Sequence, residues 1–234
     1  MSYNDLIQDG LIIENNRVVA YRSDNRSVVI PDTVTAIAER AFFKKDHVTD
    51  ISIPDSVSEI ESLAMYSMMG LMSLRLPTGL ESIGENACAM LNVRELVIPE
   101  GVRVISKGAF SYNHRLKKLT LPTGLIEIGE SAFRACDSLG ELAIPSGVER
   151  ISAYAFDGCC SVRTLSFGEG LLDIGMGAFA GCDSLSTVYI PSTVKSIGFN
   201  AFPDSGRLTV TTDLQGDIPA EWHLGKSVRI KRKK

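Results

Sequence analysis

The sequence has no apolar run approaching the roughly 18 residues that a membrane-spanning helix needs. Its first ten residues contain Asp5 and Asp9 but neither Lys nor Arg, so they lack the basic start and apolar core of a signal peptide. We therefore expect no membrane insertion. Localisation stays undecided: the protein is cytoplasmic as the sequence stands, or secreted or on the cell surface if a leader was removed.

An excess of basic charge is also missing. The formal net charge is −4 at pH 7, and phosphate backbones are bound by clustered positive charge, so we expect no nucleic-acid partner. Apolar residues make up 44% of the 234 residues and charged residues 22%. These proportions are ordinary for a folded domain with a sizeable core.

Catalytic and metal-binding patterns are absent as well. The adjacent Cys159 and Cys160 do not have the spacing of a C-x-x-C metal site. A Cys nucleophile needs a His base nearby, but His47, His114 and His223 fall in different phases of the repeat described below. We find no phosphate-binding Gly loop and no paired carboxylates. We therefore expect a protein that is not an enzyme, without catalytic residues, metal ligands or cofactors.

What the sequence does contain is a repeat. An apolar residue followed by Pro recurs in steps of 23 residues, with a single step of 22. The Pro slots are Pro31, Pro54, Pro77, Pro99, Pro122, Pro145, Gly168 and Pro191. Further slots follow each of these: Val or Leu after three residues, Ile after six, Ala after ten, and Phe after eleven in six of the eight copies. This signal indicates a repeat architecture.

Each repeat predicts one short strand and one turn or helix. The residues before Pro alternate as in a strand, and Pro then ends the strand because it lacks an N–H group. Gly or Ser after the Ile slot suits a helix N-cap, so a short helix or helical turn is expected around Ala-Phe. One unit cannot bury its own apolar side, whereas stacked units form a continuous core. The sequence thus predicts an α/β repeat solenoid with eight parallel strands on a curved sheet.

Three segments follow from this pattern. Residues 1–27 are expected to form an N-terminal β-hairpin cap, residues 28–206 the eight repeats, and residues 207–234 a C-terminal cap with a basic tail. Trp222 is expected to cover the last coil. The 22-residue step places a deletion around residues 90–92, where we expect a locally tightened but unbroken solenoid.

The pattern I-P-x-x-V-x-x-I-G-x-x-A-F-x-x-C, best kept in residues 121–136 and 190–202, resembles the BspA-type leucine-rich repeats. The resemblance covers about residues 10–205. It implies a parallel sheet on the concave face, with short helices or turns on the convex face. Members are mostly bacterial, and many are surface or secreted proteins implicated in adhesion. The resemblance supplies no catalytic residues.

Outward strand positions are the expected contact surface for a protein partner, because solenoids commonly bind on such surfaces. Glu95, Lys118 and Glu141 are expected on adjacent strands in one register, either as a self-neutralising charge ladder or as a recognition patch. Tyr189 is the strongest single contact candidate, since aromatic residues are enriched in interfaces. The complete set of binding candidates is Arg75, Glu95, Lys118, Glu141, Thr164 and Tyr189.

Three other groups have alternative interpretations. Cys136, Cys159 and Cys182 occupy one slot and are interpreted as buried apolar residues. The methionines at 65, 68, 69, 72 and 90 either fill core gaps or form an adhesive surface for self-assembly, which is the alternative to a partner-binding scaffold. The run Arg229, Lys231, Arg232, Lys233 and Lys234 is interpreted as a solvated tail. We expect a monomer.

Overall fold

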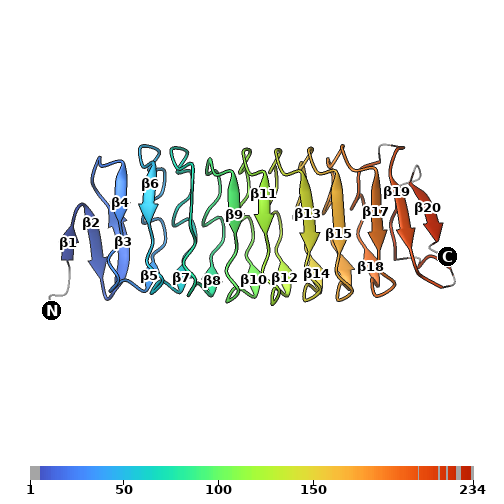
Figure 1. Cartoon of the computed structure of the whole chain (residues 1–234), viewed down its shortest axis with the longest axis horizontal. Helices are drawn as coiled ribbons and strands as arrows, with labels where there is room; N and C mark the ends of the chain where they lie inside the picture. The colour runs from blue at the N-terminus through green and yellow to red at the C-terminus, as the bar shows by residue number, and fades with distance from the viewer. Residues whose placement is uncertain (1–5, 205, 216, 220, 225–227, 233–234) are drawn as a thin grey trace.

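The repeats form a solenoid in which each unit is one coil. The structure, a computed structural model, describes residues 6–204, 206–215, 217–219, 221–224 and 228–232. The coils stack side by side along one axis, which is nearly straight in the view of Figure 1. Residues one period apart lie opposite each other, as Ile128 and Ile151 do. We number the coils by their Pro slots, from coil one (Pro31) to coil eight (Pro191).

The segment that precedes each Pro slot lies on one side of the solenoid, which we call the strand face, and two strands of the C-terminal cap continue this face (Figure 1). Its parallel strands form four separate ladders rather than one sheet: β4-β6, β9-β11, β13-β15 and β17-β19-β20. Their bounds are β4 (Ser27–Val29), β6 (Asp50–Ser52), β9 (Glu95–Val97), β11 (Lys118–Thr120), β13 (Glu141–Ile144), β15 (Thr164–Phe167), β17 (Thr187–Ile190), β19 (Thr209–Thr212) and β20 (Arg229–Arg232). The expectation of one continuous eight-stranded sheet was therefore wrong, and residues 73–75 of coil three form no strand.

In coils one to eight, a second set of short strands ends at the Ile slot and runs along the lower edge in Figure 1. With the N-terminal strands β1, β2 and β3, it forms a six-stranded sheet, β1-β2-β3-β5-β7-β8, and a five-stranded sheet, β10-β12-β14-β16-β18. Their bounds are β1 (Leu6–Gln8), β2 (Leu11–Glu14), β3 (Arg17–Tyr21), β5 (Ala36–Ile37), β7 (Glu59–Ile60), β8 (Ser82–Ile83), β10 (Val104–Ile105), β12 (Glu127–Ile128), β14 (Arg150–Ile151), β16 (Asp173–Ile174) and β18 (Ser196–Ile197). We call these the second-sheet strands.

The Ala-Phe segments form turns, and no helix occurs in the described part of the chain. Of the short helices or turns that the sequence predicts, the structure has turns, because left-handed residues recur on both sides of Ala-Phe. Ser131 and Ala135, for example, each have φ of 55°, whereas a helix needs consecutive right-handed residues. The N–H groups are instead bonded to the next coil, as from Phe133 to the Ala155 carbonyl at 2.8 Å. The turns therefore form a third hydrogen-bonded ladder, the turn face.

The core consists of repeated slots stacked on their equivalents. The Phe rings of coils four to eight form a column in which neighbouring centroids are 5.2–5.5 Å apart. The column begins at Phe110, because coils two and three place Met65 and Cys88 in the Phe slot. Both of these residues are fully buried. The prediction that the slots meet from coil to coil is confirmed by this column.

Coils three and four are joined less extensively than other neighbours. The six-stranded sheet ends at β8, the five-stranded sheet starts at β10, and the strand face is interrupted at residues 73–75. Hydrogen bonds on the turn face continue, as from Cys88 to the Ala109 carbonyl at 2.8 Å. The 22-residue step lies between the Pro slots of these two coils, and the equivalent apolar slots on both sides of it, such as Ile83 and Ile105, stay buried. The stacking is unbroken here, but two of its three ladders are interrupted.

The two ends close the core in different ways. At the start, β2 and β3 form an antiparallel hairpin whose turn contains Asn15 and Asn16, both with positive φ. At the other end Trp222 is 5% exposed, and its Nε1 donates to the Val194 carbonyl at 3.1 Å. Arg229–Arg232 is a strand paired with β19, while the tail residues Lys233 and Lys234 lie outside the described residues.

Candidate interaction surface

The six candidate residues lie on the strand face, in coils three to eight. Glu95, Lys118, Glu141 and Thr164 are exposed in β9, β11, β13 and β15. These strands alternate between outward and buried positions, as in Glu141–Ile144, where Leu142 and Ile144 are buried. The alternation of the sequence therefore decides which side chains face solvent. The result is a polar surface supported by a rigid apolar core.

The expected charge ladder is interrupted in the middle. Lys118 lies opposite Glu95 in a parallel pair, and Glu141 lies opposite Thr164 in another. The strands β11 and β13, however, belong to different ladders. No salt bridge joins Lys118 to either Glu95 or Glu141 among the described residues. The three side chains share a face, but they do not neutralise one another by direct contact.

Arg75 and Tyr189 interact with neighbours on their own face. Arg75 contacts Asp55 of the preceding coil, with 3.3 Å between Nη2 and the carboxylate. Hydrogen bonding from the Thr78 backbone N–H, together with Arg75, holds the pKa of Asp55 below its ordinary value. Burial and the nearby Asp213 raise the pKa of the Tyr189 phenol to about 12. Tyr189 is half-buried, so only part of its ring is available to a partner.

A groove of about 510 Å³ opens between β11 and β13, where the two ladders separate. Lys117 and Lys118 line one side and Glu141 the other, with Leu119 and Leu142 between them. Gly140 lines the same groove, and a Cβ added there would meet no atom within 4 Å. The groove is therefore shallow, apolar at its base and open at Gly140.

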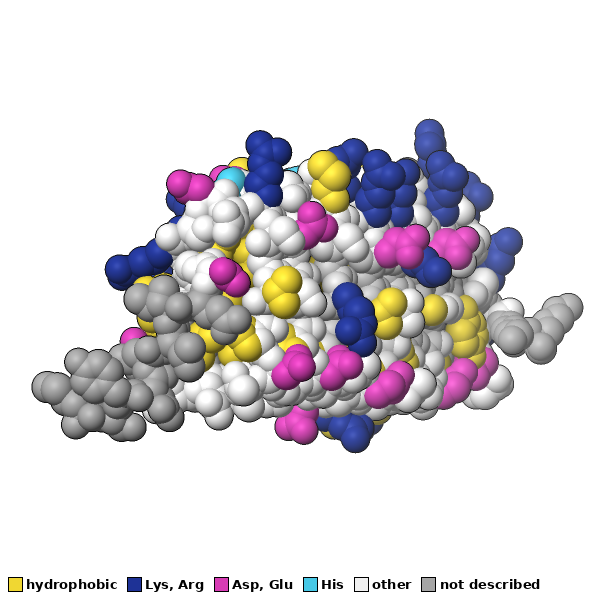
Figure 2. Space-filling model, turned by 60° about the vertical axis from the view of Figure 1, so that its left-hand side comes forward, with side chains coloured by type: hydrophobic (Ala, Val, Ile, Leu, Met, Phe, Trp, Pro, Cys, Tyr) yellow, Lys and Arg dark blue, Asp and Glu magenta, His cyan; other side chains and the backbone are white. Residues whose placement is uncertain are grey.

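Basic residues cluster along the edge where the loops lead into these strands. Figure 2 shows Lys and Arg side chains gathered along the upper edge of the molecule. The members near the groove, which we call the basic rim, are Arg94, Lys117, Lys118 and Arg163. All four are exposed, and none forms a salt bridge within the described part of the chain.

Sequence reasoning missed this rim because it weighed the net charge of the whole chain. The signal was nonetheless present in the repeat, five residues before the Pro slot. Arg26, Arg94, Lys117 and Arg163 occupy that position. A net charge averages over all faces, whereas a solenoid places one slot of each repeat along one line.

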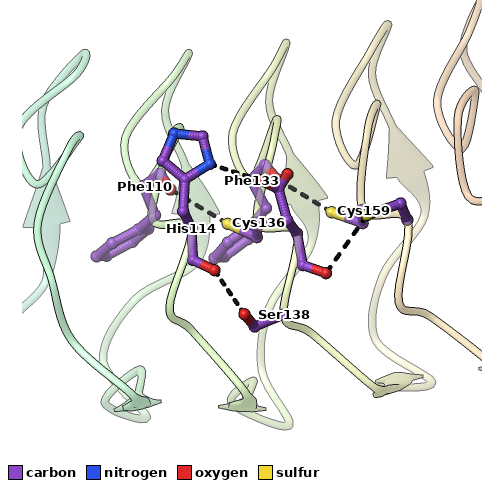
Figure 3. A network of polar contacts seen from close by, with 8 residues as sticks. Phe110, His114, Phe133, Cys136, Ser138 and Cys159 are labelled. Atoms are coloured by element: carbon purple, nitrogen blue, oxygen red, sulfur yellow. Dashed lines mark hydrogen bonds and ion pairs between the residues drawn. The ribbon is translucent and has the colours of Figure 1, made fainter.

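The cysteine and histidine side chains contact different groups, and no hydrogen bond joins them to one another within the described part of the chain. Figure 3 shows Cys136 and Cys159, whose Sγ atoms approach the carbonyls of Phe110 and Phe133 at 3.5 and 3.3 Å. Burial raises the pKa of the Cys136 thiol well above its ordinary value. His114 contacts Asp137 instead, with 2.7 Å between Nδ1 and Oδ2. The prediction that the slot holds buried apolar cysteines is confirmed, and all five cysteines are free thiols.

The methionine cluster divides between core and surface. Met65 and Met68 are fully buried, whereas Met69 and Met72 are 50% and 63% exposed. Met90 is half-buried. Core filling thus accounts for two members, and two lie on the surface of coil three. No group of three or more potential metal ligands occurs among the described side chains. Nor do these residues form any helix of the length and apolarity that crossing a membrane requires.

Comparison with known families identifies the repeat. A family described as "BspA type Leucine rich repeat region (6 copies)" matches residues 16–113 and 81–209. None of the curated proteins that were compared matches this sequence.

Several solved bacterial structures share the fold. A leucine-rich repeat protein from Bacteroides ovatus is 26% identical with a TM-score of 0.76, over 92% of this chain and 55% of that one. The T. pallidum leucine-rich repeat protein is 30% identical with a TM-score of 0.66, over 72% of this chain and 82% of that one. A leucine-rich cell surface protein from Faecalibacterium prausnitzii is 23% identical with a TM-score of 0.57, over 95% and 78%. The chain thus spans little more than half of the Bacteroides protein.

Proposed function

The chain belongs to the BspA-type leucine-rich repeat family, and from this premise we propose that it is a non-catalytic scaffold that binds a protein partner on its strand face. We further propose that it acts at a bacterial cell surface as an adhesin or surface factor. The Faecalibacterium protein, which has the same fold, is described as a cell surface protein. Localisation at the surface is the part of the proposal that rests on relatives alone.

The observation that carries the proposal is the composition of the strand face. Its outward side chains are exposed and chemically varied, while the residues between them are locked into the core, as in β13 and β15. A rigid backbone that presents varied side chains loses little conformational entropy on binding. The face also contains grooves at the places where its ladders separate. A partner can therefore contact several coils at once.

Adhesion of coated beads tests the proposal. Beads carrying the chain should bind bacterial or epithelial cells, and protease treatment of the cells should remove the binding if the partner is a protein. Val97→Arg combined with Thr187→Arg should abolish adhesion, because both residues are exposed on the strand face. Val104→Arg is the matched control, since Val104 is exposed on a second-sheet strand. Equal losses in the two variants would contradict binding on the strand face.

Self-assembly is the second candidate, and the exposed Met69 and Met72 favour it. Apolar side chains on a surface add to association when a second copy covers them. Light scattering over a concentration series would show a rising mass, which Met69→Gln and Met72→Gln would reduce. A constant monomer mass at high concentration would exclude this candidate.

A further inference from the structure

The groove between β11 and β13 combines positive charge with backbone donors that are not used within the fold. At the equivalent positions of coils two, five and seven, N–H groups donate to the preceding coil, whereas no such bond occurs in coils three, four and eight of the described structure. Lys117 and Lys118, for example, both donate to the Arg94 carbonyl, at 2.8 and 3.2 Å. Neither Gly140 nor Glu141 makes the equivalent bond to the Lys117 carbonyl within the described structure. Their two N–H groups therefore lie beside the groove without that partner.

The charges around these donors are mostly positive. Lys117 and Lys118 line the groove, and Arg163 lies beside it because its N–H donates to the Gly140 carbonyl at 2.9 Å. Glu141 is the one carboxylate among the residues that line the groove, and Glu95 lies opposite Lys118 in β9. Two lining lysines and the neighbouring Arg163 thus outnumber these two carboxylates. Cationic side chains together with backbone N–H groups are the donors that bind carboxylates most strongly.

We propose that an extended acidic peptide segment of the partner binds along the basic rim, with one carboxylate seated over Gly140 between β11 and β13. This inference rests on the proposed function, because it names the chemistry that the same face recognises. Equivalent residues of neighbouring coils are about 4.8 Å apart, so the rim from Arg94 to Arg163 spans about 14 Å. Alternate side chains of an extended peptide point to one side, about 6.6 Å apart. A short acidic strand can therefore reach several rim cations.

The lining of the groove favours a peptide over an anionic glycan. Leu119 and Leu142 lie at its base, and no aromatic ring lines it. Sugar rings are commonly held against aromatic faces, whereas apolar side chains and free N–H groups suit a peptide. The open position of Gly140 leaves room for a peptide carboxylate to approach the backbone.

The test uses a fluorescent peptide of about ten residues, which in extended form is about 33 Å long, with Glu and Thr alternating. Its anisotropy should rise with the intact chain at about 0.02 M salt and fall at about 0.3 M, where charges are screened over shorter distances. Lys117→Glu with Arg163→Glu should weaken binding by about tenfold or more. Lys195→Glu is the matched control, because Lys195 is exposed and lies away from the rim. A peptide with Gln in place of Glu should not bind.

Two further variants distinguish binding in the groove from non-specific electrostatic attraction to the protein. A Cβ at residue 140 would meet no atom within 4 Å, so Gly140→Val should fold normally by circular dichroism yet weaken binding by covering the N–H groups. Glu141→Gln removes the opposing carboxylate and should tighten binding. No binding of the acidic peptide, or equal binding by the Lys117/Arg163 and Lys195 variants, would overturn the inference.

Heparin and the bead assay distinguish the remaining outcomes. If heparin binds through the rim and the peptide does not, the ligand is a glycan and the peptide proposal fails. If beads lose adhesion with the Val97/Thr187 variant but keep it with the rim variants, the proposed function stands and this inference fails. If the peptide binds as expected but adhesion does not depend on the strand face, the proposed function alone fails.

Discussion

The ring of Phe133 lies parallel to the ring of Phe156, with 5.2 Å between centroids and 6° between planes. Both side chains are fully buried, and each has a further Phe ring on its other side. A residue in the middle of such a column supports the coils before and after it. Its removal therefore leaves a cavity that two neighbours line.

Phe133→Ala should lower the free energy of unfolding by about 3–5 kcal/mol, because a buried aromatic ring is lost and the cavity cannot collapse fully. Urea denaturation followed by circular dichroism measures this change. Phe199→Ala is the control, since Phe199 is 63% exposed and its loss should change stability by about 0.5 kcal/mol or less. If both variants lost a similar amount of unfolding free energy, the stabilising role of the Phe column would be contradicted.

Asn113 provides a second prediction, because it joins coils three and four where two ladders are interrupted. Its Oδ1 accepts from the Leu91 N–H at 3.1 Å, and its Nδ2 donates to the carbonyls of Cys88 and Phe110 at 3.0 and 2.8 Å. Asn113→Ala leaves the Leu91 N–H and the Cys88 carbonyl without this partner, at about 1–3 kcal/mol for each group left unsatisfied, whereas the Phe110 carbonyl keeps its contact with Cys136 Sγ at 3.5 Å.

We expect Asn113→Ala to uncouple the unfolding of coils one to three from that of coils four to eight, the two halves of the solenoid. Denaturation should begin earlier and show two transitions, and amide exchange should rise first around residues 71–113. Asn92→Ala is the control, because no hydrogen bond of its side chain occurs in the described structure and the residue is half-buried. A single transition at the parent midpoint would show that Asn113 does not join the halves.

These two residues show what the sequence could and could not predict. The Phe column follows from spacing alone, since equal slots in a solenoid must meet. The interruption between coils three and four does not, although the 22-residue step marked its position. A deletion of one residue marks where the repeat is shortened, but which hydrogen bonds are lost depends on the backbone geometry of both neighbours.

For the turns and for the binding face as well, the sequence predicts one part of the structure and not the other. One slot has positive φ in all eight coils, and four of its residues, Asn86, Gly108, Gly177 and Asn200, are of types that favour this conformation. These four favoured the turn over the short helix, the two forms that the sequence predicts. The outward positions of Glu95, Lys118 and Glu141 followed from strand alternation. The separation of β11 from β13 did not follow from the sequence. Apart from Gly140 itself, no residue around it indicates that the two strands fail to pair.

Cysteine reactivity gives a third prediction. Burial raises the pKa of the Cys88 thiol to about 12 and that of Cys182 still further, so these thiols stay neutral and unreactive at neutral pH. Cys160 is the exposed cysteine. A disulfide reagent should therefore modify one thiol per folded chain and all five after unfolding. Cys160→Ser should remove the reaction of the folded chain, and rapid modification of several thiols in the folded parent would contradict this burial.

The last prediction concerns the ionisation of Tyr189 in β17. Burial, and then its hydrogen bond to Asp213 and the charge of that carboxylate, raise the pKa of the phenol to about 12, above the ordinary value of about 10. Because the folded pKa is the higher one, the phenol's contribution to stability is present below pH of about 10. The contribution is lost as pH rises through about 12.

Absorbance titration at alkaline pH, with Tyr189→Phe subtracted to isolate one phenol, measures this pKa. Asp213→Asn removes the carboxylate but keeps the burial, so the pKa of Tyr189 should fall to a value between those of the parent and of a free phenol. Glu221→Gln, at an exposed position that is not among the causes of the shift, should leave it unchanged. A Tyr189 pKa of about 10 in the parent would mean that the phenol neither contacts Asp213 nor is shielded from water, so its whole ring would be available to a partner.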